Sequence, residues 1–513
     1  MSYPILRKEE NKMTVQEALK QLTELEKTRH AYEHAIGLIY CDAVTAAPED
    51  SGRGRGETLG TLSGLSYEVF ANPQVGGLLA FLREHSGELT PLQNRQVEML
   101  NREYERISKV PQAEYVQYAQ LLNEADTVWH RAKRDNDFPS FAPCLKQIVE
   151  TQRRFAGYFD PARDPYDVSL DEYERGLDQA QLDRFFSALR EKLAPLVHRI
   201  QAEGAPVDDS FLHQEFPIAQ QRALSDYLME LMTIDRSHCS IGETEHPFTT
   251  NFNKYDVRIT TKYHLDDMTN SLFSVVHEGG HALYELHTGD ELMNTCLAGG
   301  ATMGIHESQS RLFENMIGRS EAFVERIFPK LLELFPEQLK GVTPRQFYRA
   351  INKCEPSLIR IEADELTYPL HIMVRYDIEK LLFAGEISID ELPRIWAEKM
   401  KEYLGVEVPD DRRGVLQDSH WSGGSLGYFP SYAIGSAYAA QIVDAMSRDL
   451  DVPALVREGN LAPIVEWLTQ RIYQYGKAKD PDELLRIATG KSFDPTYYTD
   501  YLTRKYSAIY NLK

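Results

Sequence analysis

Apolar residues recur at helical spacing along most of this chain of 513 residues. Near the N-terminus, apolar residues stand at positions 15, 18, 19, 22 and 25. This i, i+3, i+4, i+7 pattern places one apolar stripe on one face of an α-helix. We therefore expect a fold built mainly from packed helices. The same pattern predicts further helices over 92–108, 111–134, 140–157, 179–203, 219–232, 321–335, 345–353, 370–384 and 391–404.

The predicted helices belong to one domain over 1–513, because no segment between them is long enough for a flexible linker. We divide it into a helical part over 1–240, a motif-bearing part over 241–435 and a helical part over 436–513. The segments richest in helix breakers are 85–91, 159–167 and 203–209.

One segment departs from the helical period. Residues 248–264, FTTNFNKYDVRITTKYH, are rich in Thr, Tyr, Phe and Val and nearly alternate between apolar and polar. This pattern predicts a strand or hairpin that ends just before a helix in the 270s. The expected fold class is therefore mainly α, with a small β-sheet beside one central helix.

Charge and cysteine usage exclude several classes of protein. The net charge of −22 argues against nucleic-acid binding, which requires clustered Lys and Arg. Five scattered cysteines without a CxxC pair indicate reduced thiols and a cytoplasmic location. The first residues, MSYPILRKEENKM, lack the apolar core of a signal peptide, and no apolar run is long enough for a membrane helix.

The motif His-Glu-x-x-His at 277–281 predicts a metal site. On a helix, residues i and i+4 lie on the same face, so His277 and His281 can bind one ion. Glu278 is placed to take a proton from an attacking water at the metal. The alternative is a helix with two histidines that serve only its packing. The motif also contains Gly279 and Gly280, which we expect to permit the close approach of a neighbouring backbone.

A catalytic zinc site needs a third protein ligand. His287 has the spacing of the third histidine in the pattern H-E-x-x-H-x-x-G-x-x-H, but Tyr284 stands where that pattern requires glycine. If the helix continues to Gly289, His287 points about 120° away from the other ligands. Glu307, on the next helical segment, is the better candidate. Its alternative role is an i,i+4 ion pair with Arg311 on a surface helix, and we expect the neighbouring His306 to be structural or to support a ligand.

The chain also carries HPF at 246–248, DVRIT at 256–260, HESQ at 306–309, IRIEAD at 359–364 and GVLQDSHW at 414–421. Together with His-Glu-x-x-His, these motifs resemble the signature set of the carboxypeptidase Taq family of metallocarboxypeptidases. The resemblance implies a cytoplasmic, homodimeric enzyme that removes C-terminal residues with broad specificity. It implies a zincin-like helical fold with a deep groove, and one zinc ion that cobalt can replace. It also implies that His277, His281 and Glu307 are the ligands and Glu278 is the base.

A carboxypeptidase must bind the free C-terminal carboxylate, and arginine binds carboxylates with two hydrogen bonds. We expect Arg360 to be this anchor, with Arg258 second and Arg413 less plausible. Each could instead form only a surface ion pair. Asp364 and Asp256 are expected to orient Arg360 and Arg258.

Peptide hydrolysis also builds an oxyanion that needs hydrogen-bond donors beyond the metal. His420 fits this role, with Gln417 and Asp418 expected to fix its orientation. By the resemblance to thimet-type peptidases, Tyr432 is the first choice for a tyrosine that stabilises the transition state, and Tyr428 the second. Either tyrosine could instead be a core aromatic residue.

Two other functions stay open from the residues alone. One is a metallo-endo-oligopeptidase of related fold, which would also cleave peptides with a blocked C-terminus. The other is a non-catalytic peptide-binding protein with a structural zinc. That protein would need a fourth ligand, and the sequence offers no convincing one.

Overall fold

A computed structural model describes residues 13–512. The sequence MSYPILRKEENKM, in which we predicted no signal peptide, lies almost entirely outside the described residues. The chain forms two compact units. The first contains the described residues up to Ser108 together with Glu291–Ala298, and the second contains the rest. The single catalytic domain over 1–513 stays a prediction.

The first unit is a small helical assembly with its own apolar core. Thr14 caps its first helix by accepting a hydrogen bond from the backbone of Glu17, whose side chain bonds back to Thr14. The segment 291–298 joins this unit, where the backbone N–H of Cys296 donates to Glu26 at 2.7 Å. Its helices are α1 (Val15–Thr45), α2 (Gly52–Phe70), α3 (Pro73–Glu84) and α4 (Pro91–Lys109).

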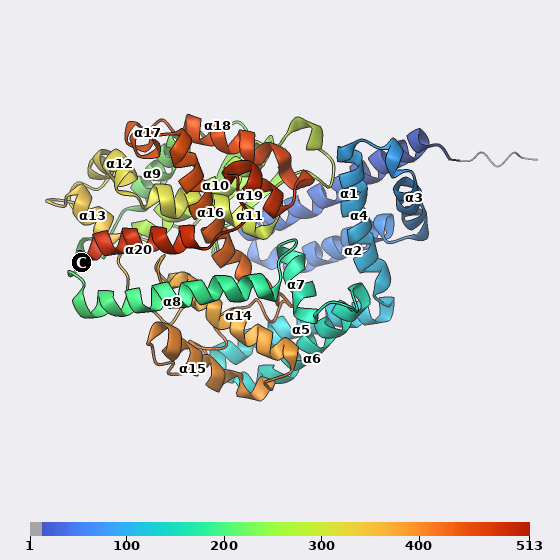
Figure 1. The fold of residues 1–513 in the computed structure, drawn as a ribbon, viewed down its shortest axis with the longest axis horizontal. Coiled ribbons are helices and arrows are strands. Elements are labelled where there is room, and N and C mark those ends of the chain that lie inside the picture. The colour runs from blue at the N-terminus through green and yellow to red at the C-terminus, as the bar shows by residue number, and fades with distance from the viewer. Residues whose placement is uncertain (1–12, 513) are drawn as a thin grey trace, which may run out of the picture. The chain divides into compact units, whose positions relative to one another are not determined.

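The second unit contains the remaining helices and the sheet. Helices α8 and α20 run side by side in it (Figure 1). Every helix predicted from periodicity is present, with ends that differ by at most three residues. The helices of this unit are α5 (Gln112–Asp135), α6 (Phe138–Phe159), α7 (Pro165–Tyr173), α8 (Gln179–Glu203), α9 (Ile218–Leu231), α10 (Met268–Leu286), α11 (Met303–Arg311), α12 (Glu321–Leu334), α13 (Pro344–Ala350), α14 (Tyr368–Ala384), α15 (Leu392–Leu404), α16 (Phe429–Asp449), α17 (Val452–Glu458), α18 (Ala462–Arg471), α19 (Pro481–Thr489) and α20 (Thr496–Tyr510).

The sheet confirms the predicted hairpin and adds a strand that the sequence pattern did not predict. β2 (Thr249–Asn253) pairs antiparallel with β3 (Asp256–Thr261), and β1 (Cys239–Glu243) pairs parallel with the other edge of β3. Both β2 and β3 pack against α10. The predicted mainly helical fold, with a small sheet beside one central helix, is thereby confirmed.

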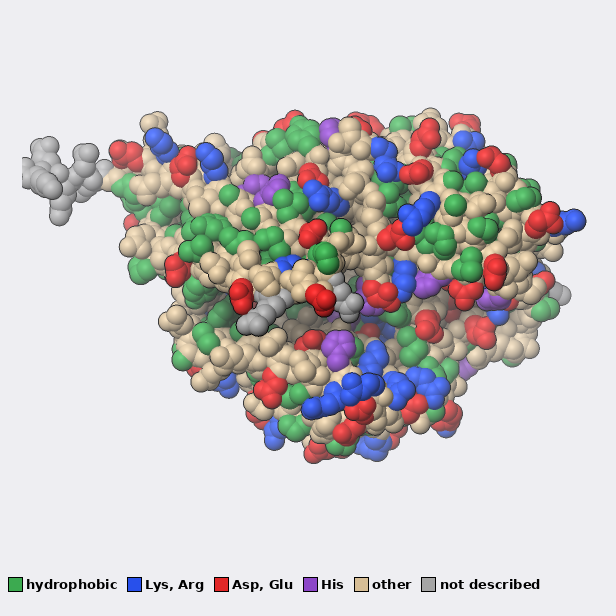
Figure 2. All heavy atoms as spheres, turned by 180° about the vertical axis from the view of Figure 1, so that it is seen from behind, with side chains coloured by type: hydrophobic (Ala, Val, Ile, Leu, Met, Phe, Trp, Pro, Cys, Tyr) green, Lys and Arg blue, Asp and Glu red, His purple; other side chains and the backbone are tan. Residues whose placement is uncertain are grey.

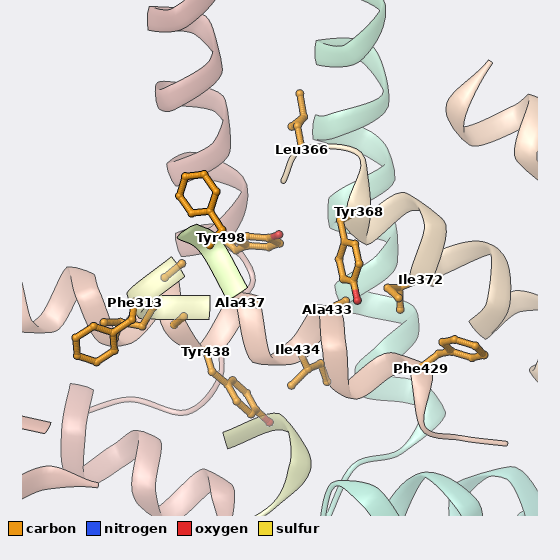
Figure 3. Close-up of a cluster of buried hydrophobic side chains, with 14 of the residues drawn as sticks. Phe313, Leu366, Tyr368, Ile372, Phe429, Ala433, Ile434, Ala437, Tyr438 and Tyr498 are labelled. Atoms are coloured by element: carbon orange, nitrogen blue, oxygen red, sulfur yellow. The ribbon is translucent and has the colours of Figure 1, made fainter. Parts of the chain in front are cut away.

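The core of the second unit surrounds α10, α11 and α16, and α11 packs along α16. Part of this core is shown in Figure 3, where Ala433, Ala437 and Tyr438 of α16 lie among buried side chains of several other elements. Small residues on α16 permit close contact, since a Cβ atom at Gly435 would lie 2.7 Å from Cβ of Glu307. This packing fixes the position of the helix that carries Glu307.

The surface carries both signs of charge, and Figure 2 shows acidic and basic side chains interspersed over one face. Among the described residues, the search for a helix long and apolar enough to cross a membrane finds none. All five cysteines lie in the described part of the chain, and none forms a disulfide.

Candidate metal centre

Helix α10 begins at a defined cap and carries its motif in the middle. Asp267 caps it by accepting hydrogen bonds from the backbone of Thr269 and Asn270. The helix is apolar on most of its surface because the sheet, α9 and α11 all cover it. His277 and His281 lie on the same face, with ring centroids 5.0 Å apart.

The two glycines of the motif permit different contacts. A Cβ atom at Gly280 would lie 2.7 Å from the backbone of Gln309 and Ser310 on α11. At Gly279 the same atom would meet side chains and no backbone: Met232 at 2.7 Å and Ile234 at 3.2 Å. The close backbone approach that we expected at the glycines therefore occurs at Gly280, and it brings α11 against the metal-binding helix.

This contact places Glu307 beside the two histidines. Its Oε2 lies 3.8 Å from Nε2 of His277 and 3.5 Å from Nε2 of His281. A tetrahedral zinc ion with ligands at about 2.0–2.1 Å holds neighbouring ligand atoms about 3.4 Å apart. Among the described residues, these three form the one group with ligand atoms close enough to hold an ion. The donor set and its spacing therefore fit a divalent metal with an open fourth position.

Each candidate ligand also contacts another side chain through the atom that points away from the other two ligands. Nδ1 of His277 lies 2.9 Å from Oε2 of Glu314, and Oε1 of Glu307 accepts from Nε of Arg311 at 2.7 Å. The predicted i,i+4 ion pair between Glu307 and Arg311 is therefore present, but it is buried and not on the surface. It uses Oε1 of Glu307 and leaves Oε2 facing the two histidines. Such outer contacts fix the orientation of metal-binding side chains.

His281 is held by a longer chain of contacts. Its Nδ1 lies 2.6 Å from Nδ1 of His306, whose Nε2 lies 2.7 Å from Oε1 of Glu285. Glu285 also accepts from the backbone of Gly300 and from the side chain of Asn251. If Nε2 of His281 faces a metal, its Nδ1 carries the proton and donates to His306, which in turn donates to Glu285. His306 thus contacts a ligand, as expected from its place in the sequence.

The charges around the ligands set their protonation states. Burial would raise the pKa of Glu307, but Arg311 and the two histidines hold this pKa well below its usual range. Burial lowers the pKa of His281 to about 4. Burial also opposes the charged form of His277, but Glu307 and Glu314 outweigh it and raise the pKa of this histidine. Metal binding requires an ionised carboxylate and neutral imidazoles, and it therefore competes with a proton mainly at His277.

Glu278 is positioned by the sheet. Oγ1 of Thr249, on β2, donates to Oε2 of Glu278 at 2.6 Å and lies 3.1 Å from its backbone oxygen. The Glu278 side chain is buried, and burial raises its pKa. The hairpin predicted from the sequence therefore orients the carboxylate that follows the first histidine of the motif.

His287 lies at the end of α10, where it is the C-cap residue. The helix ends at Leu286 instead of continuing to Gly289. Nδ1 of His287 lies 2.8 Å from the backbone oxygen of Leu283. It is not part of the group of ligand atoms around Glu307.

Arg360 lies in a buried cluster with a second arginine. Its Nε and Nη2 lie 3.1 and 2.9 Å from Oδ1 of Asp418. Nε and Nη2 of Arg375 lie 2.8 and 2.5 Å from Oδ2 of the same carboxylate. Nη1 of Arg360 donates to the hydroxyl of Tyr368 at 2.9 Å. Two guanidinium groups therefore share one carboxylate, and the cluster keeps a surplus positive charge.

Two orienting roles predicted from the sequence are wrong. We expected Gln417 and Asp418 to fix the orientation of His420, but both hold arginines. Gln417 Oε1 accepts from the backbone of Arg360 at 2.9 Å and from Arg375 at 2.8 Å. Asp364, expected to orient Arg360, instead accepts backbone hydrogen bonds, including those of Leu366 and Thr367 before α14.

His420 lies beside both candidate tyrosines. Its Nε2 lies 3.2 Å from the hydroxyl of Tyr432, and its ring stacks on that of Tyr428 with centroids 5.6 Å apart. Burial, with help from Arg360, lowers the pKa of His420 to about 4, so the ring is neutral at physiological pH. Burial raises the pKa of both tyrosines, and the Glu307 carboxylate raises them further. These hydroxyls therefore keep their protons close to the metal ligands.

Arg258 and Arg413 lie in more exposed settings. Arg258 donates two hydrogen bonds to Asp256, at 2.8 and 2.9 Å. Asp256 is the residue that we expected to orient it. Its guanidinium also lies over the ring of Phe252. Arg413 pairs with Asp410 on the surface.

Sequence reasoning missed Glu314, Glu285, Tyr368 and Arg375. Sequence reasoning could have found Glu285, because it stands one helical turn after His281 on the same helix. Glu314 was not, because it lies in a π-helical turn, Leu312–Gly318, that follows α11 and that no sequence rule predicted. Arg375 is fully buried in α14, as are His371 and Glu379 of the same helix.

Comparison with known proteins identifies the family. The family described as carboxypeptidase Taq (M32) metallopeptidase matches residues 21–506, which is almost the whole chain. The chain belongs to this family. Within the carboxypeptidase Taq family it is 41% identical, over 494 residues, to carboxypeptidase 1 of Bacillus subtilis (strain 168), covering 96% of this chain and 99% of that protein.

Two further members of the carboxypeptidase Taq family show the same full-length similarity. Thermostable carboxypeptidase 1 of Thermus thermophilus is 35% identical over 512 residues, covering 97% of this chain and all of that protein. The solved M32 carboxypeptidase from Deinococcus radiodurans R1 has a TM-score of 0.93 at 33% identity, covering 96% and 100% of the two chains. The chain is therefore a metal-dependent carboxypeptidase, and its family implies a divalent metal and peptide substrates.

Proposed function

We propose that this enzyme hydrolyses the C-terminal bond of peptides at a zinc ion held by His277, His281 and Glu307. The observation that carries the proposal is the convergence of two imidazole nitrogens and one carboxylate oxygen within reach of one ion, with the outer atom of each ligand held by another side chain. A divalent ion bound there supplies a Lewis acid for water activation and carbonyl polarisation.

Glu278 acts as the general base. Thr249 occupies its Oε2, which leaves Oε1 to accept the proton of the attacking water and to pass it to the leaving amine. The buried setting raises the pKa of Glu278, which makes its carboxylate a stronger proton acceptor. Orientation by Thr249 keeps the carboxylate next to the ligands throughout the reaction.

His420, Tyr432 and Tyr428 stabilise the oxyanion. Neutral His420 and the protonated tyrosine hydroxyls can donate hydrogen bonds to an oxyanion. The contact between His420 and Tyr432 supports the assignment of Tyr432 as the first tyrosine. Tyr428 is the second, since it stacks on the same imidazole.

Arg360 binds the free C-terminal carboxylate. Asp418 neutralises only one of the two guanidinium groups that it holds, and the Arg360 cluster therefore favours one further anion. Gln417 and Asp418 serve substrate binding by holding Arg360 in place. Arg258 is the second candidate, but its bidentate pair with Asp256 already satisfies its charge.

Several finer properties rest on the family resemblance and stay proposals. These are zinc as the native ion with cobalt as a substitute, broad residue specificity, a homodimer, and a cytoplasmic location. The absence of disulfides among the five cysteines supports a reducing location. An endo-oligopeptidase is the alternative that the proposal must exclude.

The test is Glu278→Gln, which keeps the shape of the side chain and removes the base. The variant should bind one metal ion per chain, as the parent does, and lose at least about a hundredfold in kcat. Metal content and turnover are measured on the same preparation, with free-acid and C-terminally amidated peptides. An active, metal-loaded variant contradicts the base assignment, and equal cleavage of amidated peptides by the parent supports the endo-oligopeptidase.

A further inference from the structure

The π-turn Leu312–Gly318 places a carboxylate on the outer side of the proposed metal site. Within this turn, Oε2 of Glu314 lies 2.9 Å from Nδ1 of His277. Arg311 and Arg319 contact the same carboxylate at 3.2 and 3.4 Å. If Nε2 of His277 faces a metal ion, its Nδ1 donates a hydrogen bond to Glu314, which fixes the orientation of the imidazole. The position of Glu314 therefore decides how His277 meets the ion.

The π-turn depends on contacts with other elements. Such turns are rare and occur mostly as single turns within a helix. This one follows α11 directly and packs against α10 and α16. A Cβ atom at Gly318 would lie 3.1 Å from Cγ1 of Val276, the residue before His277, so the turn ends close against the metal-binding helix. Because regular α-helical pairing is lost over these residues, neighbouring elements must hold the turn in place.

The C-terminal helix α20 holds the backbone of the π-turn. The backbone oxygen of Asn315, the residue after Glu314, accepts two hydrogen bonds from this helix. One comes from the hydroxyl of Tyr501 at 3.1 Å, and the other from Nζ of Lys505 at 3.2 Å. The same Nζ donates to the hydroxyl of Tyr501 at 3.1 Å. Two side chains of α20 thus converge on the peptide group next to Glu314.

Lys505 is held in turn by a buried carboxylate. Its Nζ lies 2.6 Å from Oε2 of Glu365, and the two side chains are only 7% and 2% exposed. The three N–H donors of the ammonium group therefore match three acceptors, which belong to Asn315, Tyr501 and Glu365.

The burial of this ion pair argues against a role in stability alone. Burial lowers the pKa of Lys505 and outweighs the opposite effect of Glu365. An ion pair taken out of water is weak evidence for stability, since apolar residues of similar volume often stabilise a fold equally well. An apolar residue at position 505, however, could not bind the backbone oxygen of Asn315. The pair therefore points to a role in position.

We propose that Lys505 is a positioning residue of the metal centre, which fixes the backbone at Asn315 and thereby holds Glu314 against His277. The inference rests on the proposed function, because it takes His277 as a metal ligand. It gives α20 a role in metal binding, although this helix carries none of the proposed ligands or catalytic residues.

The test is the double variant Lys505→Met with Glu365→Gln, which removes both charges and leaves no unpaired ion in the core. Its dissociation constant for zinc should rise by about tenfold, the lower end of the range for outer contacts of metal ligands. Competition with a chelator measures this constant without turnover. The visible absorption spectrum of the cobalt-loaded double variant should also differ from that of the parent, because His277 is oriented differently.

Two milder variants separate the contacts of α20. Lys505→Arg should bind zinc more tightly than the double variant, because a guanidinium group keeps the charge and the N–H donors. Tyr501→Phe keeps the ring and removes the other donor to Asn315, so it should weaken zinc binding in the same direction as the double variant.

Two controls exclude general effects. Arg504→Met removes one charge at the neighbouring, exposed position of α20 and should bind zinc like the parent. Leu193→Ala removes a fully buried side chain of α8 and so lowers the stability of the same unit. Its zinc affinity should nevertheless stay at the parent value.

The outcomes separate this inference from the proposed function. Unchanged zinc affinity in the double variant overturns the role of Lys505, and so does an equal loss of affinity in Leu193→Ala, because affinity then follows stability. Full zinc affinity in His277→Ala overturns the proposed ligand set and with it the proposed function. Weaker zinc binding in the double variant, with parent affinity in Arg504→Met and Leu193→Ala, supports Lys505 as a positioning residue.

Discussion

The two proposed ligand histidines differ at the level of single residues. His277 contacts the carboxylate of Glu314 directly, whereas His281 reaches Glu285 only through the imidazole of His306. A carboxylate next to a ligand imidazole increases its basicity, and the intervening neutral ring weakens this effect. His306 therefore fixes the tautomer and the orientation of His281, and its loss should affect metal binding before it affects the fold.

His306→Leu should raise the dissociation constant for zinc by about 10–100-fold, because outer contacts of metal ligands contribute effects of this size. His306→Asn should raise this dissociation constant less, since the asparagine side-chain oxygen can replace Nδ1 of His306 as the acceptor for His281. Competition with a coloured chelator measures both variants. His287→Ala is the control and should bind zinc like the parent, because His287 contacts the backbone of α10 and the ring of Tyr473 and lies outside the group of ligand atoms. Equal affinity in His306→Leu and the parent would refute the role of His306.

At the scale of elements, the site depends on the distance between α10 and α11. Gly280→Ala places a methyl group 2.7 Å from backbone atoms of α11, which cannot move without Glu307. Overpacking of this kind costs about 1–3 kcal/mol of stability. The variant should therefore unfold at lower denaturant concentration and bind zinc more weakly than the parent.

Gly279→Ala is the matched control for this prediction. Its new methyl group meets the ends of the Met232 and Ile234 side chains and no backbone atom, and the flexible Met232 side chain can change rotamer. Zinc affinity should stay at the parent value, and the stability loss should be smaller than for Gly280→Ala. If both variants keep full zinc affinity, the glycine does not set the distance between the helices.

The elements show what a sequence can and cannot reveal. Helices such as α8, Gln179–Glu203, follow from periodicity because one apolar stripe faces the core. The strand β1 was missed because its five residues, CSIGE, alternate over too short a stretch to predict a strand, and they pair only with β3. The partners of Arg360 were also missed, because Asp418 and Arg375 meet it only after distant segments have packed together.

At the scale of the whole molecule, buried carboxylates link stability to pH. Burial raises the pKa of Glu174 and of Glu379 to about 7. Glu379 accepts hydrogen bonds from Tyr166, Trp421 and Gly427, and so joins α7, α14 and the segment before α16. Glu174 accepts from the backbone of Gly304 at 2.8 Å, at the start of α11. Glu174 thus contacts the helix that carries Glu307, and Glu379 contacts the segment that leads into α16, on which that helix packs.

The sign of the linkage follows from the raised pKa values. The folded protein keeps a proton on each group up to a pH of about 7, whereas the unfolded chain releases it near the ordinary glutamate pKa of 4.5. The stabilisation is therefore complete at low pH and is lost as the pH rises through about 7. Each group should lose on the order of 1 kcal/mol between about pH 6 and pH 8.

Glu174→Gln isolates one of these contributions, because glutamine does not titrate and keeps an acceptor for the backbone of Gly304. Unfolding is measured at about pH 6 and pH 8 in the presence of a chelator, so that metal binding does not add its own pH dependence. The parent should lose more stability than the variant over this range, by on the order of 1 kcal/mol. Glu88→Gln, at an exposed position, should follow the parent profile. Parallel profiles for the parent and Glu174→Gln would show that Glu174 is already ionised in the folded protein at pH 6, and burial would then not control its proton.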